Sequence, residues 1–151
     1  MSRVLSVVCA AVALVAVGSA TVAVRADDGA IDARQKLMKG NGAAAKLGSD
    51  MGKGTVPFDL DKAKGLFDVF ADTAAKAPDL FPKGSETGGD TTASPKIWTD
   101  TAAFNAEFVK FGKDAADGKA SVKDLDTFKA AFGAIAKDCG SCHDGWRVKK
   151  G

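Results

Sequence analysis

Residue types that build metal and redox sites are scarce in this sequence. Its 151 residues include one histidine, three cysteines, four prolines and no tyrosine. Beyond the first 26 residues, the only cysteine or histidine ligands are Cys139, Cys142 and His143, too few for a four-ligand zinc site. No block of basic residues is interleaved with aromatics, which argues against nucleic acid as a partner. The chain length and the 46% hydrophobic composition suit one compact domain.

The N-terminal segment has the pattern of a secretory signal peptide. Arg3 precedes an apolar run over residues 4–17, and Val24-Arg25-Ala26 resembles a small-x-Ala cleavage site. The run is shorter than the roughly 18 to 20 apolar residues that span a bilayer, so cleavage is favoured over a retained membrane anchor. We therefore predict a signal peptide at residues 1–26, a mature domain at residues 27–151, export to the periplasm and no stable membrane insertion. Cleavage would remove two basic residues and no acidic one, which leaves no formal net charge.

Cys139, Cys142 and His143 together form a Cys-x-x-Cys-His motif near the C-terminus. A Cys-x-x-Cys pair could also be a disulfide, a thiol-disulfide redox centre or half of a zinc site. The adjacent histidine, without further ligands and without an alternating strand-helix pattern, favours covalent haem attachment instead. We predict one haem c bound through Cys139 and Cys142, with His143 as the proximal iron ligand. Arg147, one helical turn beyond His143, could cover the imidazole, contact a haem propionate, or simply be a solvated charge.

Helical periodicity dominates the rest of the chain. Apolar residues recur at spacings of three and four in four segments, over residues 28–52, 59–76, 94–117 and 121–146. A segment rich in Pro, Gly, Ser and Thr, residues 77–93, is long enough to be a crossover loop. Four amphipathic helices with little β-alternation predict an all-α fold, an antiparallel four-helix bundle with a covalently bound haem.

Helix starts and buried faces can also be predicted from the sequence. Asp59 is expected as the N-cap of the second helix, Ser94-Pro95 as the start of the third, and Ser121 with Asp124 as a capping box for the fourth. The positions expected to face inward are, helix by helix, Ile31, Met38 and Ala45; Ala63, Leu66, Phe67, Phe70 and Ala74; Ile97, Thr101, Phe104, Phe108, Phe111 and Ala115; and Leu125, Phe128, Phe132, Ile135, Cys139, Cys142 and Trp146.

The sixth iron ligand decides between an electron carrier and an open haem that binds small gases. Outside the signal segment the only thioethers are those of Met38 and Met51, and no second histidine or tyrosine competes with them. On one unbroken helix these two residues would be rotated by about 220 degrees from each other, so both could not face one haem. A methionine on an apolar stripe is more often part of a core than a ligand, so the residues alone leave ligation open.

Three segments of the chain together resemble a known family. They are Arg34-Gln35-Lys36-Leu37-Met38-Lys39, Ser94-Pro95-Lys96-Ile97-Trp98, and residues 125–147 with the haem motif. Over nearly the whole mature length the chain is similar to the cytochrome c-prime superfamily, and within it to the low-spin cytochrome c-556 type. The resemblance implies a periplasmic four-helix bundle with its haem motif near the C-terminus.

The resemblance also bears on the ligands. High-spin members carry an apolar residue at the position of Met38, whereas in the c-556 type a methionine there binds the iron. It therefore implies His143 and Met38 as the two iron ligands and Arg34 as a further residue of the haem site. Dimers are common in the family, so a homodimer is left open.

The resulting functional hypothesis is a periplasmic electron-transfer cytochrome with one His/Met-ligated, low-spin haem. It would be no enzyme, would use no catalytic residues, and would exchange electrons with a redox partner protein that the sequence does not identify. The alternative is a high-spin, five-coordinate protein of the cytochrome c-prime type that binds NO or other small gases. A structural or thiol-redox role would require that no haem is attached.

Overall fold

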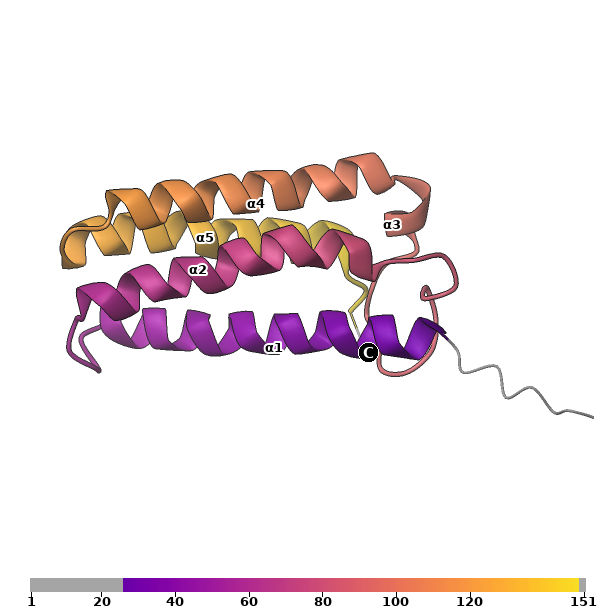
Figure 1. The fold of residues 1–151 in the computed structure, drawn as a ribbon, viewed down its shortest axis with the longest axis horizontal. Helices are drawn as coiled ribbons and strands as arrows, with labels where there is room; N and C mark the ends of the chain where they lie inside the picture. Colours follow the sequence, from indigo (N-terminus) through magenta and orange to yellow (C-terminus); the bar gives the residue numbers. More distant parts are fainter. Residues whose placement is uncertain (1–25, 150–151) are drawn as a thin grey trace, which may run out of the picture.

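The computed structural model describes residues 26–149, with side chains described from Gly29 onward. The predicted signal peptide, residues 1–26, lies outside the described residues except for Ala26. The described helices are α1 (Ala26–Gly52), α2 (Leu60–Lys76), the short 3-10 helix η1 (Ala77–Leu80), α3 (Lys96–Thr99), α4 (Thr101–Ser121) and α5 (Leu125–Trp146). The four long helices run antiparallel along the long axis of the molecule and form a four-helix bundle, as predicted (Figure 1). No described helix is both long enough and apolar enough to cross a membrane.

The start of α2 follows the sequence prediction, whereas the start of α5 does not. The Asp59 side chain accepts a hydrogen bond of 3.0 Å from the Lys62 backbone N–H and so caps α2. At α5 the N-cap is Asp124, which accepts from the Thr127 N–H at 2.9 Å, while the Thr127 hydroxyl accepts from the Asp124 N–H at 3.0 Å. Ser121, predicted as this cap, still belongs to α4, because Val122 is the first residue with an extended backbone.

The predicted third helix is interrupted at Asp100. The backbone of this residue, with φ −136° and ψ 52°, leaves the helical region and separates the single turn of α3 from α4. The Thr101 hydroxyl donates to the Ile97 carbonyl at 2.9 Å, so this carbonyl has a hydrogen-bond partner despite the break in the helix. Because the chain turns there, Thr101 is exposed rather than inward as predicted, while Ile97 and Phe104 on either side of the break are both buried.

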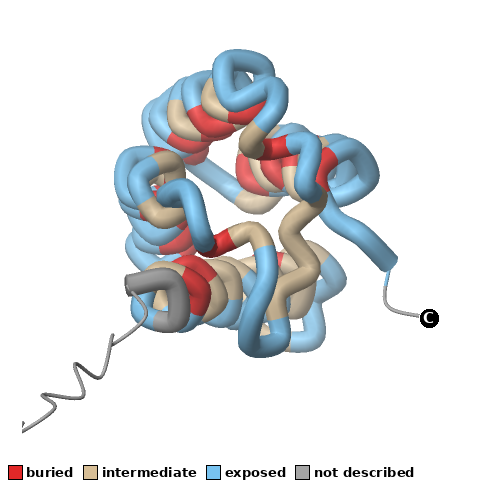
Figure 2. Tube along the Cα trace, turned by 90° about the vertical axis from the view of Figure 1, so that its right-hand side faces the viewer, coloured by how far each residue is buried: buried red, intermediate tan, exposed pale blue. Residues whose placement is uncertain are grey.

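Buried side chains form two clusters along the bundle. The first, called here the Met51 core, fills the end where α1 joins α2 and α4 joins α5, and its buried members are Ala44, Met51, Ala63, Leu66, Phe67, Phe70, Ala74, Phe111, Ala115, Val122, Phe128 and Ile135. The second, the Trp146 cluster, consists of Ala77, Ile97, Phe104, Phe108 and Trp146 with Leu37, Met38, Phe81, Ala93, Trp98 and Cys142 packed against it. Seen along the bundle, buried positions face the interior and exposed positions face outward (Figure 2).

Two glycines allow neighbouring helices to pack closely around the Met51 core. At Gly48 an added Cβ would clash with the Phe132 ring of α5, and at Gly118 it would clash with the Phe67 ring of α2. Glycine at these two positions lets an aromatic ring lie directly on the backbone of the neighbouring helix. This end of the bundle is therefore closed by ring-to-backbone packing.

Candidate haem site

Cys139 and Cys142 lie one turn apart on α5, and both thiols are free and partly buried. Burial is the main cause that raises the pKa of the Cys139 thiol, and it raises the pKa of Cys142 to about 11, with the Glu107 carboxylate adding to the effect. A thiol-disulfide redox centre needs a thiol whose pKa is lowered, so this environment argues against that alternative. Among residues 29–149, no group of three or more His, Cys, Asp and Glu side chains is placed to hold a metal ion.

His143 follows directly on α5 and lies at its exposed edge. Partial burial and the neighbouring Arg147 charge lower the pKa of the imidazole, against a smaller opposing effect of Asp144. A lowered pKa keeps the ring neutral near pH 7, with a nitrogen lone pair available. This is the form in which histidine binds iron.

The two thioethers of the described residues, those of Met38 and Met51, lie at different places on α1. Met51 is 1% exposed inside the Met51 core, whereas Met38 is partly buried and packs against the Trp146 cluster together with Cys142. The two methionines thus belong to different clusters, and the prediction that they cannot both face one haem stays a prediction. Met38 packs against the cluster that Cys142 also contacts, whereas Cys139 packs against the Met51 core.

Arg34 lies one turn before Met38 and is 5% exposed. Its guanidinium donates hydrogen bonds to the Leu80 carbonyl at 3.2 Å, to the Ser85 hydroxyl at 2.9 Å and carbonyl at 2.8 Å, and to the Thr91 hydroxyl at 2.7 Å. All these partners belong to the segment between α2 and α3. In the described structure Arg34 therefore anchors the crossover segment, and its predicted contact with haem stays a prediction.

Arg147 directly follows α5 and is exposed. Its Nε donates to the Thr92 hydroxyl at 3.2 Å, and its backbone forms an isolated bridge with Ala93. The next residue, Val148, donates its backbone N–H to the Thr92 carbonyl at 2.9 Å. The crossover segment thus contacts both Arg34 on α1 and the residues after His143, so it ties together the two helices that carry the predicted ligands.

Sequence reasoning did not find these loop partners. Ser85 is fully buried and Thr91 binds Arg34, yet both belong to a segment whose composition suggests an ordinary solvated loop. A signal for them existed in Arg34 itself, which occupies the inward stripe of α1. A buried guanidinium must find hydrogen-bond acceptors, and nearby Ser and Thr residues are natural ones.

The facing sides of α1 and α5 differ from the other inward faces in how deeply they are buried. The predicted inward residues of α2 are all buried, but Met38 and Ala45 on α1, and Phe132, Cys139 and Cys142 on α5, are only partly buried. A haem held at Cys139 and Cys142 would cover apolar side chains of this kind and would meet a neutral imidazole beside them. The residues present therefore fit the group.

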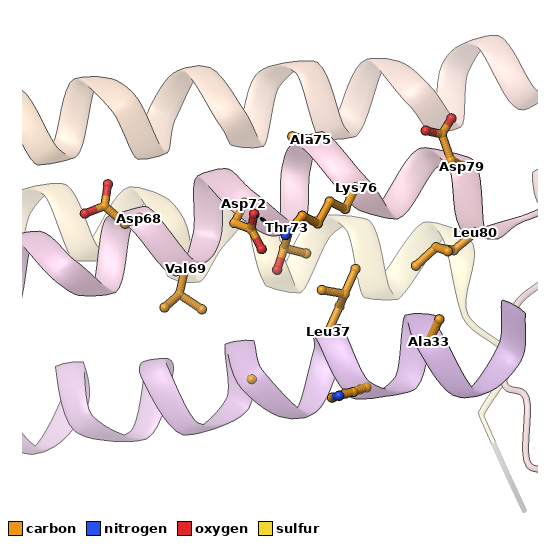
Figure 3. A pocket seen from close by; sticks show the side chains of 12 residues that line it. Ala33, Leu37, Asp68, Val69, Asp72, Thr73, Ala75, Lys76, Asp79 and Leu80 are labelled. Carbon is orange, nitrogen blue, oxygen red and sulfur yellow. Dashed lines mark ion pairs between the residues drawn. The ribbon is translucent and has the colours of Figure 1, made fainter. Parts of the chain in front are cut away.

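A cavity of about 930 Å³ lies elsewhere, between α1 and α2, and is lined among others by Leu37, Val69 and Lys76 (Figure 3). None of the four predicted attachment and ligand residues, Cys139, Cys142, His143 and Met38, lines it. The cavity therefore includes none of the predicted attachment and ligand residues, and Thr73 of α2 is among the residues that line it.

Asn41 is a further residue of the site that sequence reasoning missed. It lies one turn beyond Met38, and its side-chain amide approaches the Met38 sulfur at 4.0 Å. The inward stripe of α1 runs through residues 31, 34, 38, 41 and 45, and Asn41, like Arg34, interrupts the apolar spacing of that stripe. That interruption is the signal by which it could have been found.

Comparisons with known proteins agree on one fold. A family model described as Cytochrome C' matches residues 29–147. A cytochrome c' of Rhodopseudomonas palustris is 39% identical over 137 residues, which cover 91% of this chain and 92% of that protein. A cytochrome c-556 of the same species is 38% identical over 133 residues, covering 85% of this chain and 89% of that protein. The solved structure of cytochrome c' from Rhodopseudomonas palustris matches with a TM-score of 0.78 at 39% identity and covers 81% of this chain and 98% of that chain.

Proposed function

The chain belongs to the cytochrome c' family, and on that premise we propose that it is a periplasmic electron-transfer protein with a single His/Met-ligated, low-spin haem. The protein binds haem c covalently, and Cys139 and Cys142 are the two cysteines of the described chain that can attach it. The bound group supplies a one-electron couple between ferric and ferrous iron. The residues of this chain must hold that group in one place and in one ligation state.

One observation carries the proposal: Met38 packs on α1 in the same cluster as Cys142 on α5. The site residues also suit ligation that does not change with oxidation state. His143 is held in the last turn of α5, and Met38 lies inside the long helix α1, so neither side chain depends on a free loop. Rigid ligands keep the reorganisation that accompanies electron transfer small, which favours an electron carrier.

The relatives include proteins named cytochrome c' and proteins named cytochrome c-556, so a second function, gas binding at an open iron, has to be compared with electron transfer. In the rival, the Met38 side chain would only crowd an open iron, and NO or another small gas would bind there. We favour ligation because Met38 packs against the cluster that Cys142 also contacts, and its unbranched thioether can extend to a metal as well as fill space.

The remaining parts of the proposal concern location and partners. The apolar N-terminal run and the haem motif support export to the periplasm. Electrons would pass to and from a redox partner protein. Because basic and acidic residues nearly balance, we expect only weak electrostatic steering of that encounter.

A matched pair of substitutions tests the ligand assignment. Optical and electron paramagnetic resonance spectra of the ferric protein are compared with those of Met38→Leu and Met51→Leu, which make the same change on the same helix. We expect low-spin spectra with a sulfur-to-iron charge-transfer band in the unmutated protein and in Met51→Leu, and high-spin spectra in Met38→Leu. A low-spin Met38→Leu protein would show that another group is the sixth ligand.

A further inference from the structure

Asn41 is a polar side chain on the inward stripe of α1, three residues after Met38 and therefore on the same helix face. It is partly buried, so its amide needs hydrogen-bond partners that water supplies only in part. An apolar residue would serve packing better at this position. We therefore infer that the Asn41 amide has a function other than filling the core.

Thr73 on α2 fixes the orientation of that amide. Thr73 is 2% exposed, and its hydroxyl donates to Asn41 Oδ1 at 2.9 Å. A buried helical threonine commonly directs its hydroxyl to the carbonyl one turn earlier in its own helix, but here the hydrogen bond crosses to α1. With its oxygen held by Thr73, the Asn41 amide directs its NH₂ group to the other side, toward the Met38 sulfur at 4.0 Å.

We propose that Thr73 and Asn41 form a hydrogen-bonded relay that positions the Met38 thioether for the iron. This inference rests on the proposed function, in which Met38 is the sixth ligand. A thioether sulfur has two lone pairs, so it can bind a metal through one and accept the Asn41 N–H through the other. The relay joins α1 to α2 and restricts rotation of the long, flexible methionine side chain, which would otherwise adopt several rotamers. Asn41 and Thr73 are thus positioning residues, since neither would touch the metal.

The relay predicts how firmly ferric iron keeps its thioether when imidazole is added as a competing ligand. Asn41→Leu removes the N–H donor, and Thr73→Val removes only the hydroxyl that orients the amide. We expect both variants to stay low-spin but to lose the charge-transfer band at about two- to tenfold lower imidazole concentration, the ratio that corresponds to one ordinary hydrogen bond. Thr73→Ser keeps the hydroxyl and should restore the unmutated value.

Asn105→Leu on α4 provides the matched control, because it is the same substitution at a partly buried position outside the site. It should leave the imidazole titration unchanged. If Asn41→Leu does not fold, the Thr73→Val and Thr73→Ser pair decides the question alone. The relay would be overturned if Thr73→Val and Thr73→Ser gave the same imidazole titration. If the holoprotein were at the same time low-spin with a spectrum that depends on Met38, the proposed function would still stand. A high-spin unmutated protein would overturn both.

Discussion

Met51 and Met38 lie on the same helix but in regions of opposite character. Met51 is 1% exposed in the Met51 core, where Phe67 packs edge-on against Phe70 and Phe128, with centroids 6.3 Å apart in each pair. Met38 is only partly buried, and like Cys142 it packs against the Trp146 cluster. Under the proposed function, the Met51 core contributes mainly stability, and the region of Met38 and Cys142 contributes to holding the haem. Substitutions in the Met51 core should therefore change mainly the free energy of unfolding, whereas substitutions near Met38 should change mainly the haem spectra.

The largest expected effect is a loss of stability at the Met51 core. Phe67 is fully buried, so Phe67→Ala should lower the free energy of unfolding by about 3 to 5 kcal/mol. Urea unfolding of the holoprotein measures this, and the ferric spectrum of the folded fraction should stay low-spin. Val109→Ala, at a position 75% exposed, serves as the control and should change stability little. A Phe67→Ala protein with normal stability but altered ligation would contradict the division between the two ends.

Removal of the Arg34 anchor should affect the crossover segment next. Arg34→Leu leaves the Ser85 hydroxyl and carbonyl without a buried cationic partner, so we expect a loss of about 2 to 3 kcal/mol. Amide hydrogen exchange should increase mainly around Ser85 and Thr91. Exchange that increases equally in the Met51 core would contradict the anchoring role. Lys36→Leu, an exposed neighbour on α1, is the control.

A glycine pair tests the close approach of α1 to α5. Gly48→Ala places a methyl group against the Phe132 ring and should cost about 1 to 3 kcal/mol. Gly42→Ala on the same helix meets nothing within 4 Å, so it should stabilise the protein by up to about 1 kcal/mol through helix propensity. Thermal unfolding of the two variants should shift in opposite directions. Shifts of the same sign would mean that the ring does not lie on the backbone at Gly48.

The smallest expected effect is on how the stability of the fold changes as the pH falls. Hydrogen bonds from Thr127 hold the pKa of the Asp124 carboxyl below its ordinary value. A lowered folded-state pKa means that the carboxylate stabilises the fold above the unfolded pKa, and that this contribution is lost as pH falls through the folded value. Asp124→Ala should therefore melt at a lower temperature than the unmutated protein at pH 7, and the difference should narrow below about pH 4. A melting difference that stays constant as the pH falls would contradict this role of the Asp124 carboxylate.

Local sequence signals predict the parts of the fold that depend on neighbouring residues. Asp59 caps α2 as expected, and Phe67 and Phe70 are buried as the spacing requires, because both signals act within one or two helical turns. The break at Asp100 is not predicted, because the apolar spacing continues across it from Ile97 to Phe104. At α5, Ser121 and Asp124 both suit an N-cap, and the return hydrogen bond from the Asp124 backbone N–H to the Thr127 hydroxyl favours Asp124.

The candidate site likewise contains residues that local sequence signals identify and contacts that only the folded structure reveals. The haem motif is local in sequence and can be found directly, whereas Met38 is identified through a resemblance. The hydrogen bonds of Arg34 with Ser85 and of Asn41 with Thr73 join residues far apart in the chain. Sequence indicates that these polar groups on an inward stripe need partners, but only the packing of α1 against its neighbours determines which ones.

The most direct test of the central claim is the electron paramagnetic resonance spectrum of the ferric holoprotein at neutral pH, recorded together with that of Met38→Leu. The proposed His143 and Met38 ligation predicts a low-spin signal in the unmutated protein and a high-spin signal in the variant. A high-spin signal in the unmutated protein would contradict the electron-transfer proposal and favour the gas-binding alternative.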